Sequence, residues 1–246
     1  MRLTATTIAS ASSISFSLVV FTLCNPSLCS SRPILGSVGS PVLSDFEKVG
    51  VSGFKSYLNA IRPPNPTHEI KALFAASLPK KGEVKPAAKD SQKLSAVQPI
   101  LQYHGWSDIV EVKVIRVFQA WIGPLGPSIV LISEHALHLL NADELQALVA
   151  HELGHAYFGN AYRKALEQQQ YERAQEIELR CDAIAILTLA DLGLDPRKLQ
   201  SGLDKMSRFN SRFGTPANAH LYPSELERAR FIDEMIAVAG GKSHTR

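Results

Sequence analysis

Two histidines and a glutamate stand close together in the segment His-Glu-Leu-Gly-His at residues 151–155. On a helix, where each residue turns about 100°, His151 and His155 lie about 40° apart on one face and one turn apart along the axis. Two imidazoles at this spacing are able to bind a single metal ion, and Glu152 reaches a water activated by that ion without being a ligand. The segment therefore predicts a hydrolytic zinc site with His151 and His155 as ligands and Glu152 as the general base.

A catalytic zinc site needs a third protein ligand and one open position. The next helical stretch offers Glu178 and Asp182, which are four residues apart and therefore share a helix face. The apolar run Ala-Ile-Ala-Ile-Leu at residues 183–187 follows directly, and acids beside a buried stretch need partners. We expect Glu178 to be the third ligand and Asp182 to hold a ligand histidine in its tautomer. The alternative is that both acids pair with nearby arginines.

The motif lies within a helix that has clear signals at both ends. Asn141 with Glu144 three positions later predicts a capping box at its start, and Gly159 with Asn160 predicts its end after Phe158. Most of the other side chains of this helix are apolar, which argues against the alternative of a surface helix with two solvated histidines. Gly154 is a poor helix former in mid-helix and indicates that something packs closely there.

The elements around this helix predict an α+β fold, mostly helical with a small sheet beside the site. Residues 109–118 alternate as a half-buried strand does, residues 123–127 (Gly-Pro-Leu-Gly-Pro) break the chain, and residues 128–133 form a second strand. The remaining expected elements are helices at 45–61, 67–78 with Thr67 as its cap, 134–140, 163–190, 196–208 and 223–238, and an exposed loop at 79–93.

Composition limits the class of protein without identifying it. The 246 residues include 26 Lys and Arg against 23 Asp and Glu, a net charge of +3, and 45% of them are apolar. These values exclude a disordered chain, and the absence of a sustained basic stripe excludes a nucleic-acid partner.

The first 31 residues differ from the rest of the chain. They hold one charged side chain, Arg2, and an apolar run at residues 14–24. This pattern predicts a cleavable signal peptide and export; an organelle transit peptide and an uncleaved anchor are the alternatives, and membrane association is expected only through this segment. Only Cys181 remains after cleavage, so no internal disulfide is expected. We divide the chain into a signal at 1–31, an N-terminal helical or linker segment at 32–94 and a metal-binding domain at 95–246.

Residues 95–238 resemble the M48 family of zinc metallopeptidases, a gluzincin group that includes HtpX-type and CAAX-type proteases. The resemblance is carried by His-Glu-Leu-Gly-His at 151–155, Glu178-x-x-x-Asp182, Gly193-Leu-Asp-Pro196 and the late segment from His220 to Arg228. It implies a zincin-like fold, one Zn²⁺ per chain and hydrolysis of peptide bonds. We expect the substrates to be unfolded or extended proteins, as for a quality-control protease. In such folds a strand like 128–133 forms an exposed edge to which an extended substrate adds.

The late segment departs from the family pattern. Leu221 and Tyr222 separate His220 from Pro223, where the family has His directly before Pro. The candidates for the donor that stabilises the transition state are therefore His220, Tyr222 and Arg228, and the sequence does not favour one of them. The alternative function is a chaperone-like or binding module on a zincin scaffold whose zinc is blocked or structural.

Overall fold

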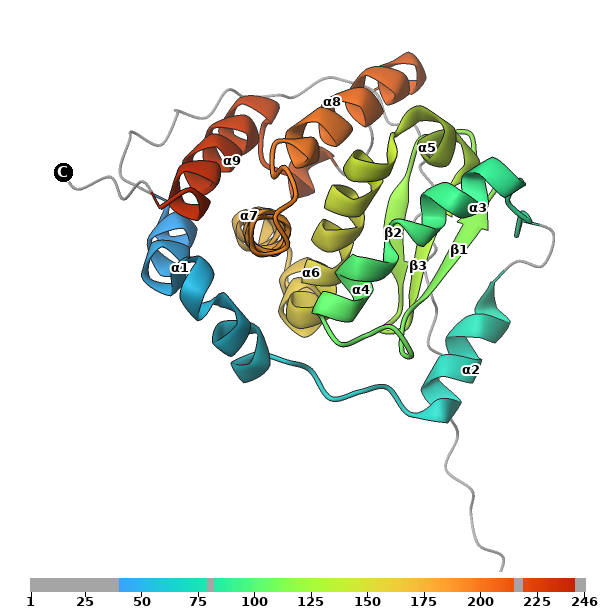
Figure 1. Ribbon diagram of the computed structural model, residues 1–246, viewed down its shortest axis with the longest axis horizontal. Coiled ribbons are helices and arrows are strands. Elements are labelled where there is room, and N and C mark those ends of the chain that lie inside the picture. The colour runs from blue at the N-terminus through green and yellow to red at the C-terminus, as the bar shows by residue number, and fades with distance from the viewer. Residues whose placement is uncertain (1–39, 79–81, 215–218, 242–246) are drawn as a thin grey trace, which may run out of the picture.

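The computed structural model describes residues 40–78, 82–214 and 219–241, so the expected signal at 1–31 lies outside the described residues. These ranges form a mostly helical α+β structure with one small sheet (Figure 1). The helices are α1 (Pro41–Ala60), α2 (His68–Ser77), α3 (Ala88–Ser95), α4 (Gln98–Tyr103), α5 (Glu134–Leu139), α6 (Ala142–Glu167), α7 (Tyr171–Asp191), α8 (Lys198–Asn210) and α9 (Glu225–Ala239), with short 3₁₀ turns η1 (Ser211–Phe213) and η2 (Ala219–Leu221); the strands are β1 (Glu111–Ile115), β2 (Ile122–Leu125) and β3 (Ile129–Ser133).

The three strands pair in the order β1-β3-β2. Strand β3 runs parallel to β1 and antiparallel to β2, and all five of its residues are buried. The prediction that the strand at 128–133 is an exposed edge is therefore wrong, because both sides of β3 are already paired. The edge that contacts α6 is β2.

Strand β2 lies where the sequence predicted a break. Ile122 pairs with Ile132 and Leu125 with Ile129, and the hairpin turns at Gly126, whose φ of 64° favours glycine. Pro124 is tolerated in this strand because β2 is at the edge of the sheet, where a missing N–H costs no ladder hydrogen bond.

Both outer edges of the sheet are partly covered. On the β1 side, the Val84 amide donates to the Val114 carbonyl (2.9 Å) and the Arg116 amide to the Gly82 carbonyl (2.9 Å). On the β2 side, the Asn210 side-chain amide pairs with both backbone groups of Ala120, at 2.9 and 2.8 Å. The asparagine amide thus occupies the place that a peptide group of a neighbouring strand would take.

Helices α6, α7, α1 and α9 pack in layers on one side of the sheet, whereas α2 lies on the other side and places Phe74 against Ile129 and Leu131 (Figure 1). Helix α6 lies next to β2, α7 packs on α6, and α1 and α9 pack on α7 and on each other. Helix α1 belongs to the segment 32–94, yet it places Phe46 and Phe54 in the same apolar core as Leu145 of α6 and Ile184 of α7. Within the described ranges, none of the helices combines the length and apolarity needed to cross a bilayer.

Several helix boundaries differ from the predicted ones, most of all the end of α6 and the start of α7. Helix α6 continues through Gly159 and Asn160 to Glu167, and the chain turns at residues 168–170, where Gln169 has a φ of 54°. Helix α7 accordingly begins at Tyr171 and not at residue 163. The region 79–93, expected as a loop, contains the start of α3 at Ala88. The capping box at Asn141 and the cap at Thr67 are as predicted.

A second buried histidine stands apart from the predicted site. His104 follows α4 and is 2% exposed; its Nδ1 lies 2.9 Å from the Tyr157 hydroxyl and its Nε2 3.1 Å from the Thr188 hydroxyl. Its ring stacks on Trp106 at a centroid distance of 5.6 Å. Burial lowers the pKa of His104 to about 3, and the nearby Arg62 adds to this effect, so the imidazole is neutral.

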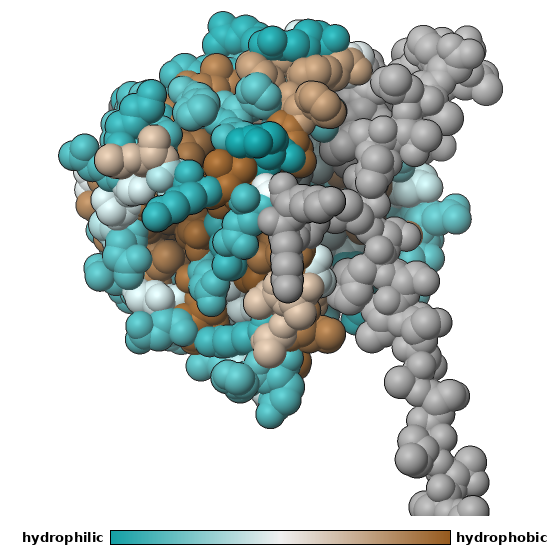
Figure 2. All heavy atoms as spheres, turned by 90° about the vertical axis from the view of Figure 1, so that its right-hand side faces the viewer, coloured by the Kyte–Doolittle hydropathy of each residue, from teal (hydrophilic) through white to brown (hydrophobic). Residues whose placement is uncertain are grey.

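The surface on the α2 and β1 side carries apolar side chains scattered among hydrophilic ones (Figure 2). Leu73 of α2 is 58% exposed, and Phe118, in the loop after β1, is 85% exposed. Single exposed apolar residues of this kind are normal on a protein surface.

Candidate metal centre

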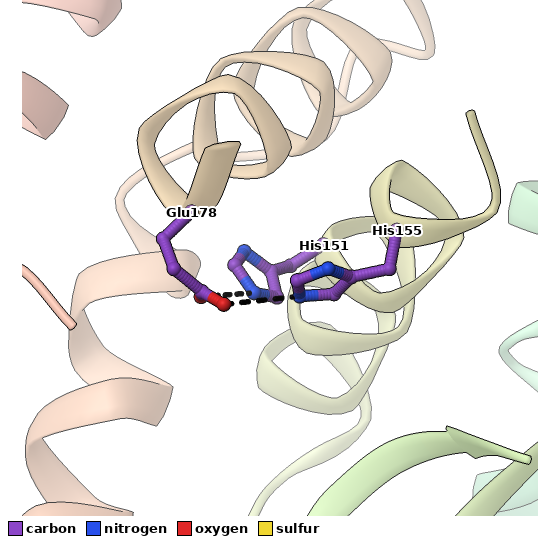
Figure 3. A group of neighbouring side chains, drawn as sticks. All are labelled: His151, His155 and Glu178. Carbon is purple, nitrogen blue, oxygen red and sulfur yellow. Dashed lines mark ion pairs between the residues drawn. The ribbon is translucent and has the colours of Figure 1, made fainter. Parts of the chain in front are cut away.

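His151, His155 and Glu178 converge from two neighbouring helices (Figure 3). One ligand atom from each of them lies within 4.8 Å of the others. The Nε2 of His151 is 3.4 Å from Glu178 Oε2, and the Nε2 of His155 is 3.5 Å from Glu178 Oε1. Two imidazole nitrogens and a carboxylate oxygen that face one another in this way could hold a metal ion. This is the one such group of His, Cys, Asp and Glu side chains among the described residues.

Local sequence explains why the three side chains meet. The Asn141 side chain accepts from the Glu144 amide (2.9 Å), and the Glu144 carboxylate accepts from the Asn141 amide (2.9 Å), which fixes where α6 begins. Glu144 is further held by Lys205 of α8 at 2.7 Å. His151 and His155 then lie one turn apart on the face that meets α7. The apolar residues after Asp182 bury α7 against α6, which brings Glu178 to the two histidines.

Asp182 contacts the first histidine on the side away from Glu178. The His151 Nδ1 lies 2.8 Å from Asp182 Oδ1, and Asp182 is completely buried. Because an ionised carboxylate only accepts, Nδ1 must carry a hydrogen, and Nε2, which faces Glu178, is therefore the nitrogen that could bind a metal in place of a proton. The contact expected between Asp182 and a candidate ligand is therefore present.

Arg228 neutralises Asp182. Its Nε donates to Asp182 Oδ2 at 2.8 Å and one terminal nitrogen to Oδ1 at 2.7 Å, a bidentate pair contributed by α9. Burial opposes the charge of Asp182, but Arg228 and the hydrogen bond from His151 outweigh it and lower the pKa of Asp182 to about 2. Arg228, expected among the transition-state donors, is thus engaged in positioning Asp182.

Glu152 is buried beside the group without being part of it. It is 9% exposed, and burial raises its pKa to about 8, with the charge of His151 acting in the opposite direction. Burial opposes protonation of both histidines and lowers the pKa of His155 to about 4. At His151 the hydrogen bond to Asp182 and the charge of Asp182 outweigh burial and raise the pKa of His151 to about 10. A buried acid next to two imidazoles is the environment in which a carboxyl group exchanges protons near neutral pH.

The structure does not bring His220 into the group. It lies on η2 with an exposed side chain, its ring packs edge-on against Tyr171 at a centroid distance of 4.5 Å, and its carbonyl accepts from Gln175 Nε2 at 2.9 Å. Nothing in these contacts gives His220 a role toward a metal.

Tyr162 is a residue of the site that the sequence analysis missed. Its ring packs edge-on against His155 at a centroid distance of 5.2 Å. Burial and the nearby Glu178 carboxylate raise the pKa of Tyr162 well above its usual range. Tyr162 follows His155 by seven residues, two turns along the same face of α6. The signal was present, but an end of the helix at Phe158 concealed it.

The donor set and its surroundings fit a metal. Two imidazole nitrogens and one carboxylate, supported by a further carboxylate, are the ligands of catalytic zinc sites. A scan against protein-family models finds no family that matches the chain, and a search of the curated proteins finds no match, so the reading of this centre rests on its geometry.

Proposed function

We propose that the protein is a zinc-dependent metalloendopeptidase with a zincin-like catalytic domain of the M48 type. The observation that carries the proposal is the buried convergence of His151, His155 and Glu178 around one point, with Glu152 on the same helix. The second contact of His151 to Asp182 supports it, because such a contact orients metal-binding imidazoles.

Each residue has a role in the proposed reaction. His151, His155 and Glu178 hold the ion, and Asp182, neutralised by Arg228, keeps His151 in the metal-binding tautomer. When bound, Zn²⁺ supplies a Lewis acid for the scissile carbonyl and acidifies water toward a pKa of ~7. Glu152 takes the proton from the attacking water and delivers it to the leaving amine.

Zinc is favoured over other metals by the donors and by Glu152. Two histidines and a carboxylate also bind ferrous iron in oxygenases, so the donor set alone leaves two metals to compare. The histidine spacing within one helix and an adjacent buried glutamate are the pattern of hydrolytic zinc sites. Elemental analysis of the purified protein, with zinc and iron measured together, decides between them, and we expect zinc at one equivalent.

The proposed substrates are unfolded or extended polypeptides, and β2 is the strand to which they would add. The Trp121 carbonyl accepts from the Ser133 amide and therefore points toward β3. Because backbone groups alternate in direction along a strand, the backbone groups of Ala120, Ile122 and Pro124 point away from β3, toward the free edge. Asn210 already pairs with Ala120, and Pro124 has no N–H. A substrate therefore gains few main-chain hydrogen bonds here, and side-chain contacts must supply part of its affinity.

The decisive experiment replaces Glu152 with glutamine and measures bound zinc together with cleavage of unfolded casein. We expect one equivalent of zinc and a loss of cleavage of at least ~100-fold, because the proton acceptor is removed. Glu167→Gln is the matched control, since Glu167 is an exposed residue at the end of the same helix, paired with Arg163. Cleavage by Glu152→Gln at the wild-type rate would refute the mechanism. A wild-type protein that holds zinc and binds unfolded chains without cleaving them would instead favour the binding module.

A further inference from the structure

Gly154 stands at the closest approach between the two helices that carry the metal centre. It is the fourth residue of the His-Glu-Leu-Gly-His segment, well inside α6. Glycine is among the poorest helix formers, and no positive φ is recorded at this position, so backbone conformation does not explain it. The explanation must come from what lies opposite.

A side chain at Gly154 would collide with the backbone of α7. A Cβ built there would lie 2.8 Å from the Cα of Cys181, 2.9 Å from its Cβ and 3.1 Å from its Sγ. The nearest of these atoms belongs to the main chain, so no rotation of a side chain relieves the contact. Gly159 is five residues further along the same helix, and nothing lies within 4 Å of a Cβ built there.

The point of contact coincides with the residues that complete the centre. Cys181 follows Glu178 by three residues and directly precedes Asp182, while Gly154 directly precedes His155. The distance between the two helices at this point therefore fixes the distance between the histidines on α6 and both carboxylates on α7.

A metal tolerates little change in that distance. To reach ordinary contact, a Cβ at Gly154 must move from 2.8 to at least 3.4 Å from the Cys181 Cα, a displacement of about 0.6 Å between the helices. Metal–ligand distances hold to within about 0.2 Å of their ideal values. A displacement of this size at Gly154 would take Glu178 out of bonding range of an ion held by His151 and His155.

We propose that Gly154 is a positioning residue for the metal centre: the missing side chain sets the spacing of α6 and α7 at which Glu178 completes the ligand set. This inference rests on the metal centre proposed above and adds a residue that touches neither the ion nor the substrate.

The test compares Gly154→Ala with Gly159→Ala in the full chain. Zinc affinity is measured by competition with a chromophoric chelator, and the ligand geometry by the visible absorption spectrum of the Co²⁺-loaded protein. We expect Gly154→Ala to weaken zinc binding at least ~10-fold and to alter the Co²⁺ spectrum, with helical circular dichroism retained. Gly159→Ala should leave both metal readouts unchanged. Ile100→Val, a core substitution on α4, controls for lost stability and should also leave them unchanged.

A second pair of variants covers the outcome in which Gly154→Ala does not fold. Cys181→Ala and Cys181→Val both remove the thiol, but valine places a methyl group in the space that Gly154 leaves open. We expect alanine to bind zinc as the wild type does and valine to bind it more weakly. The positioning role is overturned if Gly154→Ala binds zinc with wild-type affinity and has an unchanged Co²⁺ spectrum. If Gly154→Ala does not fold, the same result in Cys181→Val overturns it. A wild-type protein that binds neither zinc nor Co²⁺ would overturn the proposed centre itself.

Discussion

Asp182→Asn tests the energetics of the metal centre most directly. In the folded protein the Asp182 carboxylate is fully buried and accepts two hydrogen bonds from Arg228, at 2.8 and 2.7 Å, and one from His151 at 2.8 Å. Asparagine removes the charge and leaves the guanidinium, whose side chain is 15% exposed, without its counter-ion. Breaking a buried pair from one side costs about 3–5 kcal/mol. Loss of the contact to His151 should also weaken zinc binding about 10- to 100-fold.

The assay is urea unfolding of the metal-free protein, followed by zinc titration of the folded variant. The control is Glu134→Gln, which breaks a second bidentate arginine–carboxylate pair at the surface, where the Arg116 side chain is 71% exposed. Since exposed pairs contribute little, this control should cost less than about 1 kcal/mol. Both variants remove one carboxylate charge opposite an arginine, so the difference between them measures the burial of the Asp182 pair together with its contact to His151.

A double-mutant cycle with Arg228→Gln shows whether the two residues act as a pair. The double variant buries two neutral amides, so we expect it to be more stable than the sum of the single variants predicts, by about 1–3 kcal/mol. The reasoning is refuted if Asp182→Asn costs no more than Glu134→Gln and the effects of Asp182 and Arg228 simply add.

Three further predictions concern other parts of the chain. The pKa of His104 is lowered in the folded state, so as the pH falls the unfolded chain binds a proton at this residue before the folded chain does. The contribution of His104 to stability is full above about pH 6.5 and falls by about 1.4 kcal/mol per pH unit toward pH 3, which is a loss of about 2 kcal/mol at pH 5. Urea unfolding at about pH 7 and about pH 5 measures this loss, and His104→Gln should remove it. Tyr162→Phe keeps the ring against His155 but removes the hydroxyl near Glu178, and zinc affinity measured by chelator competition should fall severalfold, whereas Tyr157→Phe should not change it. Removing the metal with a chelator should lower the thermal midpoint of unfolding. Free zinc at a hundred times its Kd should raise the free energy of unfolding by about 2.7 kcal/mol, and a Glu178→Ala chain should lack this effect.

Local signals in the sequence predicted the start of α6 but not its end. The capping box of Asn141 and Glu144 involves residues three apart, and it forms as expected. Gly159 and Asn160 are also typical end signals, yet α6 passes through them because an exposed glycine in a helix costs only about 1 kcal/mol and the buried Ala165 anchors the following turn. Tertiary packing outweighed propensity, and the misplaced end hid Tyr162.

The sheet also shows that local sequence patterns do not predict how separate elements pair. Residues 123–127 contain two glycines and two prolines, a composition that predicts a break, and the strand β2 formed there depends on pairing with β3. Strand order is set by contacts between elements, so no local pattern could place β3 at the centre. The pairing of Asp182 with Arg228, which are 46 residues apart, is equally invisible to local patterns. Of the metal centre, the spacing of His151 and His155 was fully encoded in one helix, whereas Glu178 depended on how α7 packs.

The covered edges of the small sheet bear on how the protein behaves when it is crowded or partly opened. An exposed strand edge is a template on which a second chain can add and begin aggregation. Here Gly82 and Val84 occupy one edge, and the Asn210 amide with Pro124 leaves little to pair with on the other. Copies of the protein should therefore resist edge-to-edge association, and Asn210 contributes to colloidal stability from a position that has no part in the metal centre.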